Sequence, residues 1–216
     1  RILELSALPG PAGFEEKAAA RVREMFAEVV DEVRVDVMGN VIGLRRCGRE
    51  NARRLMIDAH LDEIGFVVTG YEEGFLRFAA DGSVDARMLP GAQVRVLTEP
   101  AMTGVIAVSP PHVLSKEDSD KVIKIEDLYI DVGLTQEEAA RKIPLGTPAV
   151  FDVAPRVFGE GFITGKALDD RACLAVAIEA MGRLRDKPLA ADVYLLASTQ
   201  EELGRRGIKT AAYEIA

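Results

Sequence analysis

Hydrophobic spacing along the chain alternates between helical and strand-like stretches, and their order predicts the architecture. Near the N-terminus, apolar residues recur every three to four positions and predict an amphipathic helix: Ala18, Val22, Met25, Phe26 and Val29. Strand-like segments follow, separated by turns or polar loops: 32–37, 41–44 and 55–59. The same mixture returns late in the chain, with a helix expected over 171–184 and a strand over 192–199. Both parts are therefore expected to be α/β.

The middle of the chain has a different pattern, with short strand-like pieces and frequent turn signals. The expected strands are 75–79, 93–97, 102–108, 128–132 and 148–151. One short helix is expected after Thr135, because Thr135-Gln136-Glu137-Glu138 has the form of a capping box. An all-β stretch between two α/β stretches is typical of an insertion. We expect an α/β catalytic domain in two segments, 1–69 and an incomplete 156–216, around an inserted β-rich, barrel-like domain at 70–155.

Composition limits the partners. The chain has 216 residues, of which 48% are hydrophobic, enough to bury a real core. Its 27 basic and 35 acidic residues give a formal charge of −8, which argues against nucleic acid or an anionic membrane as the main partner. No apolar run approaches the roughly 20 residues that span a bilayer. Two cysteines are too few for a disulfide framework. We expect a soluble, cytoplasmic protein.

Three polar clusters carry the candidate chemistry. Each directly follows an apolar run or precedes an expected helix: His60-Leu61-Asp62-Glu63, Asp169-Asp170 and Glu201-Glu202. Ligand sites of open α/β sheets lie beyond the carboxyl ends of the strands, so these clusters are expected to meet. Histidine and carboxylates together suit zinc, cobalt or manganese. The pattern predicts a metal-dependent enzyme.

Each cluster also has an ordinary structural interpretation. A single histidine after a strand is usually a loop residue, but His60 stands among Asp58, Asp62 and Glu63, which favours a ligand whose far ring nitrogen Asp62 orients. Asp169-Asp170 fits a helix cap as well as a bridge between two metals, and spacing alone leaves both open.

Glu201-Glu202 fits a solvated turn, yet it follows an apolar strand. Successive side chains of an extended segment diverge, so one carboxylate can bind a metal while its neighbour takes a proton from water. Lys166 and Arg171 fit an anionic-substrate site or ion pairs equally well.

The motifs resemble those of the tetrahedral, dinuclear-metal aminopeptidases, a group that includes glutamyl aminopeptidases and proteins labelled cellulase M. The matching segments are Pro9-Gly10-Pro11-Ala12-Gly13-Phe14-Glu15, Asp36-Val37-Met38-Gly39-Asn40-Val41, Asp58-Ala59-His60-Leu61-Asp62-Glu63-Ile64-Gly65-Phe66, Gly165-Lys166-Ala167-Leu168-Asp169-Asp170-Arg171 and Gln200-Glu201-Glu202-Leu203-Gly204-Arg205-Arg206-Gly207. In order and spacing they extend over the whole chain, and jointly they are highly specific.

The resemblance implies a role for each candidate residue. His60 would bind one metal, Asp169 would bridge both, and Glu202 would bind the other. Glu201 would be the general base and acid, and Asp62 the partner of His60. The resemblance also implies a cis Asp169–Asp170 peptide bond.

The resemblance further implies a three-layer α/β/α core, two divalent ions per subunit, zinc or cobalt, and short peptides as substrates. The β-rich insertion would form homodimers that assemble into a tetrahedral dodecamer. We expect the subunit contacts in this insertion, because its apolar residues exceed what a small domain easily buries: Phe75, Leu76, Phe78 and Met88.

Two other functions compete with the aminopeptidase. A glycosidase would use paired carboxylates without a metal, and a non-catalytic assembly module would suit a truncated chain. The chain starts at Arg1 and stops within an expected helix, so we expect both ends to be cut. The family takes a further Asp and a further His from downstream sequence. Residues 1–216 alone are therefore expected to be inactive, unless Glu63 or His112 completes the site. Further strands beyond Ala216 are expected to cover the edge of the 192–199 strand.

Overall fold

The computed structural model describes residues 1–110 and 123–216, which form two compact units. The first unit combines Arg1–Glu63 with Ala154–Ala216, and the second is Ile64–Val153. The second unit begins earlier than the expected insertion at 70–155, because the strand that starts at Gly65 belongs to it. Across the described ranges, every helix is too short or too polar to cross a membrane.

The first unit is built on a four-stranded sheet with the order β1-β2-β12-β3. The strands are β1 (Glu32–Val35), β2 (Val41–Arg45), β12 (Asp192–Ser198) and β3 (Arg54–His60). β12 pairs parallel with β3 and antiparallel with β2. The expectation that the 192–199 strand lies at an exposed edge is wrong, because β12 lies between β2 and β3 and the outer strands are β1 and β3.

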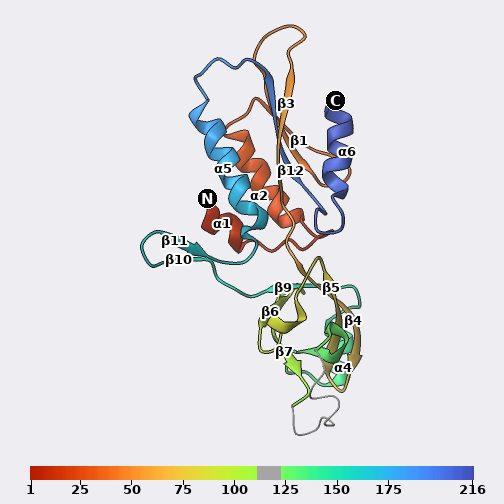
Figure 1. Ribbon diagram of the computed structural model, residues 1–216. Helices are drawn as coiled ribbons and strands as arrows, with labels where there is room; N and C mark the ends of the chain where they lie inside the picture. The colour runs from red at the N-terminus through yellow and green to blue at the C-terminus, as the bar shows by residue number, and fades with distance from the viewer. Residues whose placement is uncertain (111–122) are drawn as a thin grey trace. The chain divides into compact units, whose positions relative to one another are not determined.

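Helices cover both faces of this sheet (Figure 1). One face carries α1 (Ile2–Ala7), α2 (Glu16–Ala27) and α5 (Leu168–Arg183), and the other carries α6 (Arg206–Ile215). Along β12, Leu195 packs in the α1/α2/α5 core and its neighbour Leu196 packs against α6. The central residues of the strand, 193–197, are apolar because both of its faces are covered. The three-layer α/β/α architecture is confirmed.

Local contacts explain where the sequence-based boundaries differ. β1 stops at Val35 because the Asp36 carboxylate accepts hydrogen bonds from the backbone N–H groups of Met38 and Asn40, at 2.9 and 3.0 Å, and turns the chain. Helix α1 and the two-stranded hairpin of β10 (Arg156–Phe158) and β11 (Phe162–Thr164) were not expected.

The second unit is a closed six-stranded barrel in the order β4-β5-β8-β7-β6-β9. Its elements are β4 (Gly65–Glu72), β5 (Phe75–Asp81), the 3₁₀ helix η1 (Ala86–Met88), β6 (Gln93–Val96), β7 (Met102–Val108), the 3₁₀ helix η3 (Ile125–Asp127), β8 (Leu128–Asp131), α4 (Gln136–Lys142) and β9 (Pro148–Phe151). The predicted capping box at α4 is confirmed, with reciprocal bonds between Thr135 and Glu138.

The barrel buries more of its apolar residues than expected. Leu76 and Phe78 lie in its core, and the Phe66 ring stands 5.1 Å from the Phe78 ring in an edge-to-face contact. Met88 remains 72% exposed. Of the four apolar residues expected at subunit contacts, Leu76 and Phe78 are therefore buried, Phe75 is half-buried and Met88 is exposed.

Asn40 joins the turn after β1 to the end of β12 and to α6. Its side-chain oxygen accepts from the Thr199 N–H at 2.9 Å, and its amide donates to the Gly207 carbonyl at 3.0 Å. Gly207 allows this close approach, because a Cβ there would lie 2.2 Å from Asn40 Oδ1 and 2.5 Å from the Thr199 carbonyl oxygen.

Gly207→Ala is expected to lower the free energy of unfolding by about 1–3 kcal/mol, as overpacking does. Gly182→Ala is the matched control, since the nearest atom to its Cβ would be 3.6 Å away and alanine favours a helix by about 0.5–1 kcal/mol. Urea unfolding of both variants measures the difference. Equal stability of Gly207→Ala and the parent chain would contradict the packing argument.

Candidate metal centre

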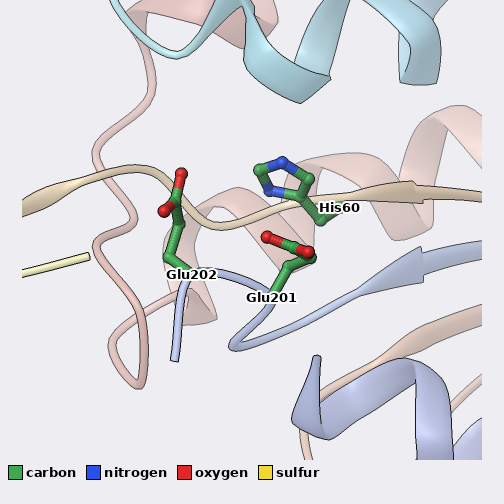
Figure 2. A group of neighbouring side chains, drawn as sticks. All are labelled: His60, Glu201 and Glu202. Carbon is green, nitrogen blue, oxygen red and sulfur yellow. The ribbon is translucent and has the colours of Figure 1, made fainter. Parts of the chain in front are cut away.

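The candidate site lies at the carboxyl ends of two neighbouring parallel strands. His60 is the last residue of β3 and pairs in register with Ser198, the last residue of β12. Glu201 and Glu202 follow in the turn after β12. Figure 2 shows these three side chains gathered around a common space. The predicted meeting of the first and third polar clusters is therefore what the structure shows.

The distances suit a bound cation. One ligand atom each from His60, Glu201 and Glu202 can be chosen so that all lie within 4.8 Å of one another. The second cluster joins them, since Asp169 Oδ1 lies 3.0 Å from His60 Nε2. Two ligands of one tetrahedral zinc stand about 3.3 Å apart at the usual bond lengths, so these two atoms fit one coordination shell. The Asp169 side chain is 90% exposed and accessible to an ion.

The hydrogen bonds of His60 also fit a metal ligand. Its Nδ1 donates to the backbone oxygen of Asp62 at 3.0 Å, which in the neutral ring leaves the Nε2 lone pair facing Asp169. Two lone pairs repel at this distance unless a proton or a metal ion lies between them. Burial lowers the pKa of His60, but Asp62 and Asp169 outweigh it and raise the pKa to about 9. The donor set therefore fits a divalent cation.

Asp62 contacts His60 differently from the sequence-based expectation. The contact of hydrogen-bond length comes from its backbone oxygen, while its carboxylate stands 3.6 Å from Nδ1. That carboxylate accepts from the N–H groups of Glu201 and Glu202, both at 3.0 Å. Burial would raise the pKa of Asp62, but His60 and these two amides hold it below its usual value. Asp62 thus ties the end of β3 to the turn that carries both glutamates.

Glu15 is a site residue that sequence reasoning missed. It precedes α2 and is buried, and its carboxylate accepts from the Gln200 N–H at 3.0 Å. Burial raises its pKa above the usual value although backbone N–H groups oppose the shift. The only sequence signal was its place in the first family-like segment.

Asp169 and Asp170 interrupt the start of α5. Both have non-helical backbone angles, so the regular helix begins at Arg171, as the sequence predicts. The peptide bond between them is cis, as the resemblance implies.

Glu63, Lys166 and Arg171 form a separate buried ion cluster. Lys166 Nζ lies 2.7 and 2.9 Å from the two Glu63 carboxylate oxygens, and Arg171 lies 3.7 Å from Glu63. The suggestion that Glu63 completes the metal site is therefore wrong, because two cations already neutralise it. Of the two interpretations of Lys166 and Arg171, the ion-pair one is confirmed. His112 lies outside the described residues.

Arg171 also connects three parts of the unit. Fully buried, it donates to the carbonyl oxygens of Leu61 at 3.0 Å and Leu5 at 2.8 Å, and to that of Leu8. Leu61 stands between His60 and Asp62, so Arg171 fixes the start of α5, and with it Asp169, against the end of β3.

Comparison with known proteins bears on this geometry. The family described as M42 glutamyl aminopeptidase matches residues 39–216. The chain belongs to this family. It is 35% identical over 215 residues to a lysyl aminopeptidase of Pyrococcus furiosus, covering 96% of this chain and 60% of that protein.

Solved structures agree with the family. A TET aminopeptidase from the marine sediment archaeon Thaumarchaeota archaeon SCGC AB-539-E09 superposes with a TM-score of 0.92 at 35% identity, over 99% of this chain and 61% of that one. The TET1 peptidase of Pyrococcus horikoshii, described as assembling into a tetrahedron or a large octahedral shell, gives a TM-score of 0.85 at 35% identity, over 98% and 65%. The chain thus spans about three fifths of these relatives.

Arg171→Met is expected to lower the free energy of unfolding by about 3–5 kcal/mol, because it leaves buried carbonyl groups unpaired and removes one cation from Glu63. Arg183→Met, on the same helix, is the control. Arg183 is 79% exposed in its pair with Glu179, and exposed pairs contribute little. Guanidinium unfolding curves measure both variants. Similar small effects at the two positions would mean that the buried contacts of Arg171 do not stabilise the fold.

Proposed function

We propose that this chain forms the larger part of a metal-dependent aminopeptidase that removes N-terminal residues from short peptides. The observation that carries the proposal is the convergence of His60, Asp169, Glu201 and Glu202 at the ends of two parallel strands. Family membership supports the peptidase class.

The side chains divide the work by position. His60 would hold one divalent ion, zinc or cobalt, Glu202 the other, and Asp169 would lie between the two. Such ions, when bound, lower the pKa of water and polarise the scissile carbonyl. Asp62 keeps the His60 ring and the glutamate turn in place through its backbone oxygen and its carboxylate.

Glu201 would move the proton. It accepts a proton from the attacking water and returns it to the amine that leaves, as a general base and then a general acid. Its Oε1 lies 3.2 Å from Nε of Arg205, which is exposed, so the charge of Glu201 has a partner in the absence of substrate. Geometry alone would also allow Glu201 as a ligand, and the family resemblance is what separates the two glutamates.

The alternative functions have less support. Glycosidase carboxyl groups stand roughly 5–10 Å apart across a sugar. Here one ligand atom from each of His60, Glu201 and Glu202 lies within 4.8 Å of the other two, and this arrangement suits a cation. A non-catalytic assembly module would have no use for this buried polar framework. Both cysteines are free thiols, which suits a reducing compartment, and we place the activity in the cytoplasm.

In the full-length protein, Glu201→Gln is expected to lower kcat by about 10²–10⁴-fold while metal content stays unchanged, because it removes a proton acceptor and no ligand. Glu202→Ala and His60→Ala should each lower metal content instead. Mass spectrometry of the purified variants and hydrolysis of an aminoacyl substrate panel distinguish the two effects. Loss of metal from Glu201→Gln would show that Glu201 is the ligand and that Glu202 carries the proton. Hydrolysis of a glycosidic substrate that persists in a chelator, without aminoacyl hydrolysis, would favour the glycosidase.

The protein would work as a homo-oligomer, with dimers formed through the barrel and assembled into a tetrahedral dodecamer. The Pyrococcus horikoshii relative supports this, since it assembles into closed shells. The exposed Met88 on the barrel is a candidate contact.

Deleting residues 64–153 from the full-length protein and joining the flanks by a short linker is expected to give a monomer. The first unit should still fold, because its hydrophobic core contains no barrel residue. Light scattering measures the particle mass, and circular dichroism checks the fold. Dimers or larger particles of the folded variant would place the interface outside the barrel.

A further inference from the structure

Two buried carboxylates hold three consecutive backbone amides in the turn after β12. Glu15 accepts from the N–H of Gln200, and Asp62 accepts from those of Glu201 and Glu202, each at 3.0 Å. The carboxylates come from different parts of the first unit, one preceding α2 and the other following β3.

We propose that Glu15 is a positioning residue of the metal centre, which fixes the directions of Glu201 and Glu202 by holding the Gln200 amide. The proposal rests on the proposed function, because it gives those two glutamates their roles as proton carrier and ligand.

The backbone conformation of Gln200 needs support from its surroundings. Its φ of 53° lies in the left-handed region, which a residue with a side chain adopts only when the surrounding structure holds it there. Rotation about φ and ψ of Gln200 turns the peptide plane that follows relative to the one that precedes. Glu15 holds the preceding plane through the Gln200 N–H, and Asp62 holds the following plane through the Glu201 N–H. Each contact restrains one of the two planes, together with the bonds from the Gly207 N–H to the Thr199 oxygen at 3.0 Å and from the Arg206 N–H to the Gln200 oxygen at 3.2 Å.

The side chain of Glu15 is suited to this task. It occupies the N-cap position of α2 but makes no capping bond to its own helix, where a shorter Asp or Ser would be preferred. Its residue surface is only 5% exposed, and burying a carboxylate is costly unless it is hydrogen-bonded. Its length instead lets it reach the turn after β12.

The experiment uses the full-length protein stripped of metal and titrated with zinc or cobalt. Three substitutions separate reach from charge: Glu15→Ala removes the acceptor, Glu15→Asp keeps the charge but shortens the side chain, and Glu15→Gln keeps an acceptor oxygen at the same length. The matched control is Glu16→Ala, since Glu16 is exposed in the first turn of the same helix. Calorimetric metal affinity, kcat, KM and unfolding midpoints are measured for each.

Glu15→Ala and Glu15→Asp are expected to weaken metal binding about tenfold or more and to lower kcat with little change in KM, as loss of a hydrogen bond to a charged group would. Glu15→Gln should restore most of both, and Glu16→Ala should match the parent protein. If Glu15→Ala does not fold, the contrast between Glu15→Asp and Glu15→Gln tests the same point.

Normal metal affinity and kcat in Glu15→Asp, with only a lower unfolding midpoint, would overturn the proposal and leave Glu15 a structural residue. Losses in Glu15→Gln without losses in Glu15→Asp would also overturn it, because charge and not the reach of the hydrogen bond would then matter. Failure of the proposed function would give a different result, because the parent protein would then bind metal without hydrolysing any aminoacyl substrate. The expected order of metal affinities among the Glu15 variants would still support the positioning role.

Discussion

The site depends on the hydrogen bonds that the Asp62 carboxylate accepts from the backbone N–H groups of Glu201 and Glu202. Asp62 is fully buried, and a buried carboxylate is tolerated only with partners. The two N–H groups reach Asp62 only when the chain turns back after β12. The segment after β3 and the turn after β12 therefore form together. The backbone oxygen of the same residue fixes His60. One residue thereby contacts the ring and the backbone amides of both glutamates.

The buried side chain of Arg171 places Asp169, the other candidate site residue. Arg171 binds carbonyl oxygens from α1, from the segment after it and from the end of β3, and so places the start of α5 beside His60. Asp169 precedes Arg171 by two residues and is exposed toward solvent. The hydrophobic layers bring the elements together, but buried polar contacts decide which atoms face one another. This division explains how the exposed Asp169 side chain can be placed accurately beside His60.

The sequence predicted the parts of the site that leave a local signal. Paired charges after an apolar strand are unusual, and they pointed to Glu201, Glu202 and the His60 cluster; the family resemblance then separated their roles. Periodicity predicted the α/β character, and the resemblance implied the three layers, in which Leu195 and Leu196 are covered on opposite faces of the sheet. Glu15 and the Glu63 ion cluster could not be recognised this way. Their partners are distant in sequence, and a long-range hydrogen bond leaves no periodic pattern.

The outer position of β3 would link sheet growth to cation affinity at the candidate metal centre. β3 is the last strand of the four-stranded sheet within the described ranges, Leu55 on it is 52% exposed, and its final residue is His60. A further strand laid along this edge would restrain the backbone that carries the His60 ring. Linkage then requires the converse, that an occupied metal centre favours addition of the strand by the same factor. Pairing of a strand with the edge of β3 and binding of a cation at His60 would therefore each raise the affinity for the other, through a single strand.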